Sequence, residues 1–229
     1  MSEKIIAYKA MNPDMTCRGK KYETGKTYFE DKADCCRKGM HACENPFEVL
    51  RYYPMRDNPR FFEVECGGEI SKSDEGSKLA CTELTVKGEL KVTDFAKIGV
   101  EAVMKRIAKK AANAKEKASG DYSTGAASGW CSTGAASGDY STGAASGRCS
   151  TGAASGRCST AEVSGKDSIA VANGYKSKAR GAIGCYIVLT EYDDDGNMLL
   201  AKMANVDGAV IKENTWYTLK NGEFVEWKP

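Results

Sequence analysis

The sequence is poor in several features that particular functions require, and each shortage excludes something. Its 229 residues include one histidine, His41, so no mechanism that needs two histidines is available. The formal net charge is only +2, so no global field favours nucleic acid or a membrane surface as a partner. No apolar run approaches the length of a membrane span, and the first residues, MSEKIIAYKA, lack the apolar core of a secretion signal. We therefore expect a soluble protein of the host cytoplasm.

Large aliphatic side chains are absent from residues 119–160, which contain no Leu, Ile, Val, Phe or Met. The chain instead repeats every nine residues, as SGDYSTGAA, SGWCSTGAA, SGDYSTGAA, SGRCSTGAA, SGRCSTAEV, SGKDSIAVA and a looser NGYKSKARG. A flexible linker needs no such phase, whereas a fixed period is typical of a solenoid. The third and fourth positions alternate between units, which predicts two units per coil, with Tyr122 under Tyr140 and Cys131 under Cys149.

The interior of such coils would be filled by Ala, Ser and Thr, which bury little apolar area per residue. Pairing of several rods would relieve this weakness, so we predict a homo-oligomer. The segment GKDSIAVANGYKSKARGAIG (165–184), with the units before it, resembles the head repeats of trimeric autotransporter adhesins. That resemblance implies a parallel β-roll and a trimer, but no adhesin role, because no export signal or membrane anchor is found.

The composition changes along the chain predict four parts. Residues 1–93 are expected to be an α+β domain, with strands in KIIAYKAM, KTYFE, RFFEVECGGEI and LACTELTVKGEL and short helices in DKADCCRKG and NPFEVLRYYP. We expect a basic amphipathic helix, capped by Asp94, over residues 94–118. The short parallel β-solenoid is expected over residues 119–181. Residues 182–229 predict an antiparallel β-meander cap, with turns at Asp195-Gly196 and Asn221-Gly222.

Two surfaces are candidates for binding a partner. The helix has an apolar stripe and a basic face, and that face would be either solvated or a contact for an acidic partner. The stripe consists of Val100, Val103, Ile107, Ala111, Ala114 and Ala118, and the basic face of Lys105, Arg106, Lys109 and Lys110. The outward aromatic residues of the repeat, Tyr122, Trp130 and Tyr140, would contact either a partner or another copy of the chain.

Residues that carry chemistry are sparse. Cys36, His41 and Cys43 are weak candidates for zinc ligands, but their spacing matches no standard pattern, and buried structural thiols are the alternative. The string Gly25-Lys26-Thr27 is not a phosphate loop, because Lys20 stands where the first glycine of that motif belongs. We therefore assign no metal and no cofactor.

Much of the chain outside the repeat resembles an uncharacterised domain that recurs in phage and prophage proteins. The resemblance is carried by YKAM (8–11), DMTCRGKKYETGKTY (14–28), CRKGMHACENPFEVLRYYP (36–54), RFFEVECGGEI (60–70) and the tail VDGAVIKENTWYTLKNGEFVEW (206–227). It implies an origin in a mobile element. The first functional hypothesis is therefore a counter-defence protein that binds and inhibits a host immune component, such as a CRISPR protein, without being an enzyme. A structural virion or decoration protein is an alternative.

An enzymatic alternative comes from a looser similarity. The order of a strand with YKA, the segment GMHACENPFEVLRYY and a strand with Glu63 and Glu65 is similar to an ADP-ribosyltransferase scaffold. That similarity implies Tyr8, His41, Tyr53 and Glu65 as the groups to test. The alternative is that the two glutamates form the exposed face of an amphipathic strand, since spacing alone does not define a catalytic geometry.

Overall fold

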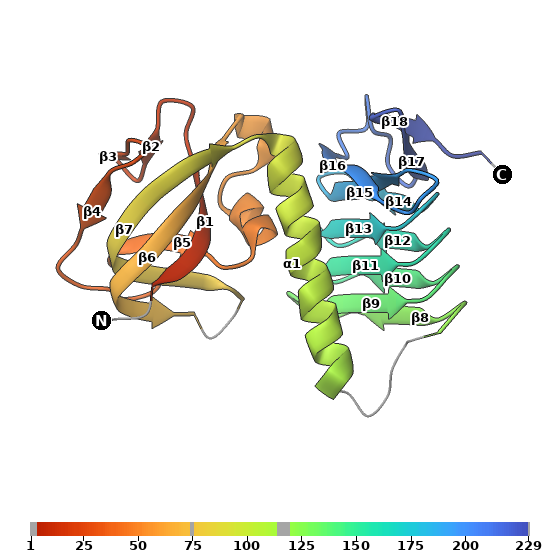
Figure 1. The fold of residues 1–229 in the computed structure, drawn as a ribbon, viewed down its shortest axis with the longest axis horizontal. Helices are drawn as coiled ribbons and strands as arrows, with labels where there is room; N and C mark the ends of the chain where they lie inside the picture. Colours follow the sequence, from red (N-terminus) through yellow and green to blue (C-terminus); the bar gives the residue numbers. More distant parts are fainter. Residues whose placement is uncertain (1–3, 74–75, 114–119, 229) are drawn as a thin grey trace. The chain divides into compact units, whose positions relative to one another are not determined.

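The computed structural model describes residues 4–73, 76–113 and 120–228, except for the side chains of residues 107–113. The chain divides into two compact units, Met1–Phe95 and Ala96–Pro229. Both are built mainly from β-strands, and Figure 1 labels the elements. No helix among the described residues is long and apolar enough to cross a membrane.

The N-terminal unit contains a closed ring of four antiparallel strands (Figure 1). The ring runs β5, β1, β6, β7 and closes because β7 pairs with both β5 and β6. The short β4 adds to β7, and β2 pairs with β3 in a separate hairpin. The strands are β1 (Ile5–Met11), β2 (Thr16–Cys17), β3 (Lys20–Lys21), β4 (Thr27–Phe29), β5 (Met40–Cys43), β6 (Arg60–Lys72) and β7 (Lys78–Leu90).

The four predicted strands are confirmed, and the unit is mainly β rather than clearly α+β. DKADCCRKG forms a tight turn, in which Asp34 and Lys38 form a β-bridge, instead of a helix. Cys36 takes a left-handed φ of 72°, which no helix residue adopts. NPFEVLRYYP forms only the 3-10 helix η1 (Pro46–Arg51), followed by η2 (Met55–Asp57). Asn45 is the N-cap of η1, and its side chain accepts a hydrogen bond from the Phe47 N–H.

The core of this unit explains three of its six cysteines. Alternate residues of β6 and β7 point inward and pack against β1 and β5. Cys17, Cys66 and Cys81 are members of this core and behave as small apolar side chains. All ten cysteines of the chain are free thiols.

Helix α1 (Val92–Asn113) begins two residues before the predicted start, so Asp94 lies in its first turn rather than at its cap. Phe95 is fully buried and stacks on Phe61, with ring centroids 4.0 Å apart. Val100 and Val103 of the predicted stripe are buried. The remaining members of that stripe lie outside the described side chains: Ile107, Ala111, Ala114 and Ala118.

The repeat forms the predicted parallel β-solenoid, with successive nine-residue units placed alternately in two sheets (Figure 1). Thr124 pairs with Thr142, and Thr133 with Thr151, so equivalent residues two units apart stack directly. The coil of two units is therefore confirmed. One sheet contains β8 (Thr124–Ala127), β10 (Thr142–Ala145), β12 (Thr160–Val163) and β14 (Lys178–Gly181); the other contains β9 (Thr133–Ser137), β11 (Thr151–Ser155), β13 (Ile169–Asn173) and β15 (Tyr186–Tyr192).

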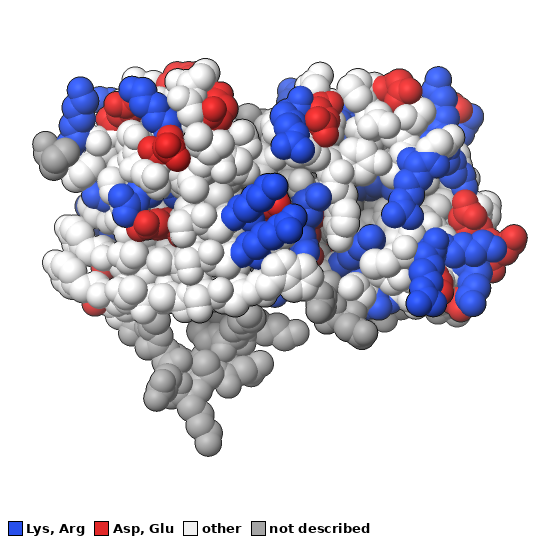
Figure 2. Space-filling model, turned by 180° about the vertical axis from the view of Figure 1, so that it is seen from behind, with Lys and Arg blue, Asp and Glu red and all other residues white. Residues whose placement is uncertain are grey.

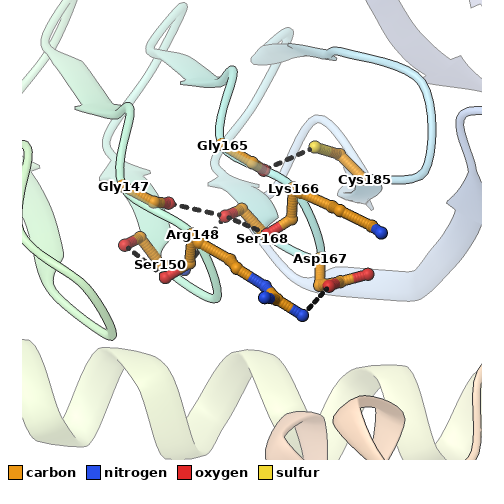
Figure 3. A network of polar contacts seen from close by, with 8 residues as sticks. All are labelled: Gly147, Arg148, Ser150, Gly165, Lys166, Asp167, Ser168 and Cys185. Carbon is orange, nitrogen blue, oxygen red and sulfur yellow. Dashed lines mark hydrogen bonds and ion pairs between the residues drawn. The ribbon is translucent and has the colours of Figure 1, made fainter.

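A ladder of buried serines holds successive coils together. The serine at the fifth position of a unit donates its hydroxyl to the carbonyl of the second-position glycine one coil earlier. These bonds are Ser141 to Gly120, Ser150 to Gly129, Ser159 to Gly138, Ser168 to Gly147 and Ser177 to Gly156. At the end of the ladder Cys185 replaces serine, and its Sγ lies 3.0 Å from the Gly165 carbonyl (Figure 3). The predicted thin interior is therefore held by polar bonds as well as by apolar contact.

The C-terminal segment forms hairpins at the two predicted turns, but they extend two different sheets and do not make one meander. In the first, β15 pairs with β16 (Met198–Asn205) and continues one solenoid sheet; in the second, β17 (Tyr217–Lys220) pairs with β18 (Glu223–Glu226) and continues the other. The two open sheet edges explain this, because each needs its own strand to cover it. At the predicted turn, Asn221 and Gly222 have φ of 51° and 74°, and a type I′ turn requires such positive values at both positions. Ile187, Leu189 and Val206 enlarge the core at this end.

Candidate functional site

The N-terminal unit has a cavity of about 280 Å³ that is partly open to solvent. Its walls come from β1, the β2–β3 hairpin, the turn before β5, β5 itself, η1 and the first residue of β7. The lining residues that carry polar or aromatic groups are Tyr8, Lys9, Cys17, Arg18, Lys20, Tyr22, Glu30, Arg37, Lys38, His41, Cys43, Tyr52, Tyr53 and Lys78. These residues are distant in sequence, and the closed ring of β5, β1, β6 and β7, which forms a small barrel, brings them together.

Lys9 is the most unusual member of the lining. Strand alternation places it on the same face of β1 as Ala7 and Met11, and it is only 5% exposed. Its Nζ donates a hydrogen bond of 2.8 Å to the His41 carbonyl and lies 5.2 Å from the centre of the Tyr22 ring. None of the ion pairs between described residues includes Lys9. A buried ammonium group therefore faces the cavity with neutral protein partners only.

The rest of the lining adds to this positive charge. Six lining residues are cationic and one, Glu30, is acidic. Glu30 is occupied by Lys20, whose Nζ lies 2.8 Å from its carboxylate, and this pairing lowers the Glu30 pKa. Lys78 lies over the Tyr52 ring, with Nζ 4.5 Å from its centre. The cavity is therefore strongly electropositive although the N-terminal unit as a whole has a balanced composition.

His41 adds no charge to the cavity near neutral pH. Burial, reinforced by the nearby cations Lys78, Arg18 and Lys9, lowers the pKa of its ring to about 4. Its Nε2 accepts a hydrogen bond of 3.1 Å from the backbone N–H of Cys36. The ring is therefore a neutral group whose orientation depends on the turn that carries Cys36.

The structure brings together three of the four groups proposed for ADP-ribosyl transfer. Tyr8, His41 and Tyr53 line the cavity, whereas Glu65 does not. Glu65 forms ion pairs with Lys4 at 2.8 Å and Lys87 at 3.1 Å, and hydrogen bonds from these lysines lower its pKa. Alternation along β6 places Glu63 and Glu65 on one face, opposite the buried Phe62 and Val64.

The candidate zinc ligands are near one another, but their donor atoms are unsuited to a metal. The His41 Nε2 faces the Cys36 N–H, and burial raises the pKa of the Cys43 thiol to about 12. Zinc requires a thiolate and a free imidazole nitrogen. In the part of the chain that the structure describes, no cluster of three His, Cys, Asp or Glu side chains is arranged to hold a metal ion.

The predicted partner-binding residues lie elsewhere. Lys105 and Arg106 are exposed on α1, while the side chains of Lys109 and Lys110 lie outside those described. Tyr122 and Tyr140 are exposed and stack with ring centroids 5.1 Å apart, before β8 and β10 of one sheet. Trp130 precedes β9 of the other sheet, so it does not extend the tyrosine stack. On the face in Figure 2, basic and acidic side chains are intermixed, and neither sign covers it alone.

Comparison with known proteins gives one match. Residues 5–98 match a family described as a domain of unknown function (DUF7666), and this range contains every residue of the cavity. No curated protein matches the chain, and no solved structure matches it. The cavity-bearing unit is therefore similar to a domain whose description states no function.

Sequence reasoning missed the cationic half of the site. Lys9, Arg18, Arg37, Lys38 and Lys78 were assigned no role, because their charges are offset elsewhere in the same unit. One signal was present in the first strand. In KIIAYKAM (residues 4–11), Lys9 alternates with the core residues Ala7 and Met11 and so lies on the same face of the strand. A charged residue on the core face of a strand indicates a special site.

Proposed function

We propose that the N-terminal unit is a binding module for a small phosphorylated organic anion. The observation that carries the proposal is Lys9, a buried ammonium group whose partners are a carbonyl and an aromatic ring. Burying a charge without a counter-ion is costly, so such a group is retained where a ligand supplies the opposite charge. Arg18, Arg37 and Lys38 line the same cavity and extend the anion site.

The size and the aromatic lining narrow the ligand class. A volume of about 280 Å³ lies at the small end of ligand pockets, so the ligand is about the size of a mononucleotide or smaller. Tyr8, Tyr22, Tyr52 and Tyr53 line the cavity and offer apolar faces to a planar group. A mononucleotide or a comparable phosphorylated metabolite fits both features.

The experiment is a calorimetric titration of the full chain with inorganic phosphate and AMP. We expect binding of at least one of these, and weaker binding as salt rises, since the site is cationic. Lys9→Met should weaken affinity by about tenfold to a hundredfold, because a charged hydrogen bond contributes about 1.5–3 kcal/mol. Lys26→Met is the matched control, because Lys26 is exposed and pairs with Glu23 outside the cavity.

The stability of the free variant separates a ligand site from a structural lysine. If Lys9 is retained for a ligand, Lys9→Met should fold normally and be at least as stable as the natural chain, since it removes a buried charge. A variant that binds as the natural chain does, or that merely unfolds, would contradict the proposal. So would the absence of any anion binding by the natural chain.

The other functional hypotheses remain predictions. Inhibition of a host immune protein, with the solenoid as an oligomerising scaffold, predicts a stoichiometric complex when the tagged chain is incubated with lysate from a bacterium that carries several defence systems. The ADP-ribosyltransferase alternative predicts that the chain consumes NAD, and the virion alternative that it is found in purified particles. The trimer predicts a threefold mass by light scattering.

A further inference from the structure

Two adjacent thiols lie on the turn beside the cavity. Cys35 is half-buried and Cys36 is exposed, and their Sγ atoms are 3.9 Å apart. The turn is held by backbone hydrogen bonds in both directions between Asp34 and Lys38, of 2.9 and 2.8 Å. A further bond of 3.1 Å, from the Cys35 N–H to the Ser71 hydroxyl, fixes the turn to β6. The two sulfur atoms are therefore held next to each other by the surrounding backbone.

We propose that Cys35 and Cys36 form a redox-active vicinal dithiol that a hydroperoxide converts to a disulfide. Hydrogen peroxide transfers one oxygen to the Cys36 sulfur, which becomes a sulfenic acid, and one water leaves. The Cys35 sulfur then attacks the Cys36 sulfur, and the hydroxyl leaves with the Cys35 proton as a second water. The two thiols lose two electrons and the peroxide gains them. The sulfur atoms must approach from 3.9 Å to about 2.05 Å.

The order of these steps follows from the surroundings of the two sulfurs. Cys36 is the one cysteine of the ten that is exposed, so an oxidant reaches it first. Burial raises the pKa of the Cys35 thiol, and its Sγ lies 3.7 Å from the Lys78 carbonyl. Cys35 is therefore the poorer target for the oxidant and is placed to react second, with the neighbouring sulfenic acid.

The disulfide would change the wall of the cavity. The peptide bond between the two cysteines becomes part of the small ring that the disulfide closes. The N–H of that peptide is the donor that holds the His41 Nε2 at 3.1 Å. Drawing the sulfurs together therefore reorients this N–H and moves the imidazole. Arg37 and Lys38, which follow directly, also line the cavity, so oxidation alters the charged wall as well.

The test is oxidation of the full chain with hydrogen peroxide, removal of the remaining peroxide with catalase, and trypsin digestion without oxygen. Cleavage after Lys32 and Arg37 releases ADCCR, residues 33–37, which holds both thiols and no other cysteine. We expect this peptide to lose two hydrogens and to regain them with dithiothreitol. Cys35→Ser and Cys36→Ser should abolish the change, and Cys158→Ser, which removes a half-buried thiol of the solenoid, should preserve it.

The single histidine gives a second readout that needs no ligand. The imidazole signal of His41 in proton NMR should shift on oxidation in the natural chain and in Cys158→Ser, and stay in place in folded Cys35→Ser. An ADCCR peptide that keeps both thiol hydrogens, or that carries only over-oxidised Cys36, would overturn the proposal that the two cysteines form a disulfide. A disulfide without a shift of the His41 signal would overturn its coupling to the cavity. Because neither readout uses an anion, failure here is distinct from failure of the binding proposal.

Discussion

The serine ladder makes a quantitative prediction about the solenoid, and Ser168 is the position that tests it best. Its Oγ donates to the Gly147 carbonyl at 2.9 Å and accepts from the Ser150 N–H at 2.9 Å (Figure 3). Ser168 is fully buried. Ser168→Ala therefore leaves one buried acceptor and one buried donor without this partner, and water cannot easily replace it.

The expected cost follows from these two groups. Each unsatisfied buried polar group costs about 1–3 kcal/mol, so for the two groups together we expect Ser168→Ala to lower the free energy of unfolding of the C-terminal unit by about 2–6 kcal/mol. With a urea dependence of about 2 kcal/mol per molar, the urea midpoint should fall by about 1–3 M. All three tryptophans, at positions 130, 216 and 227, lie in this unit, so tryptophan fluorescence during urea unfolding reports on it selectively.

Two other substitutions make the measurement decisive. Ser164→Ala removes a hydroxyl from an exposed serine of the same repeat and should leave the midpoint unchanged. Ser168→Cys should lose less than Ser168→Ala, because Cys185 already occupies the equivalent position and contacts the Gly165 carbonyl. A midpoint for Ser168→Ala equal to that of Ser164→Ala would refute the idea that buried serines hold the coils together.

Two further predictions concern the close packing of the coils and the neutral histidine. Gly143→Ala should disrupt the solenoid, since its Cβ would overlap the Ala153 carbonyl, whereas Gly129→Ala, whose Cβ meets nothing nearer than 3.8 Å, should be tolerated; circular dichroism and the urea midpoint distinguish them. The His41 pKa of about 4 in the folded chain lies below the unfolded value of about 6.5. Between these values the unfolded state binds more protons, so the N-terminal unit should lose stability as pH falls from about 6.5 to 4, and His41→Gln should reduce this loss, measured by urea unfolding at several pH values.

The sequence predicted the solenoid well because a coil is specified locally. The nine-residue period and the alternation of its third and fourth positions determine which residues stack, and Tyr122 does lie on Tyr140. The backbone at the fourth position was not predictable in the same way. Tyr140, Cys149 and Asp167 all adopt left-handed φ there, and tyrosine and cysteine are not residues that favour this conformation. The turn of the coil requires a left-handed backbone at the fourth position, and this requirement outweighs the conformational preference of the residue found there.

The N-terminal unit was predicted less well because its form depends on contacts between distant segments. DKADCCRKG has the composition of a helix end, yet Cys35 is bonded through its backbone to Ser71 and through its thiol to the Lys78 carbonyl. These partners lie on β6 and β7, and together with the bridge between Asp34 and Lys38 they favour the turn. No local pattern within the nine residues contains that information, because it arises only when the barrel closes.

The cavity shows how a balanced composition conceals a charged site. Acidic residues of the same unit pair with lysine and arginine away from the cavity, as Glu65 does with Lys4 and Lys87 and Glu89 with Arg60. Lys9 has no such partner among the described ion pairs, and its strand phase directs it inward. Because the fold places these acidic residues away from the cavity, the cavity has an excess of positive charge that the composition of the unit does not show. Because a buried, uncompensated ammonium group lowers stability, its presence at a core position is explained better by a bound anion than by folding.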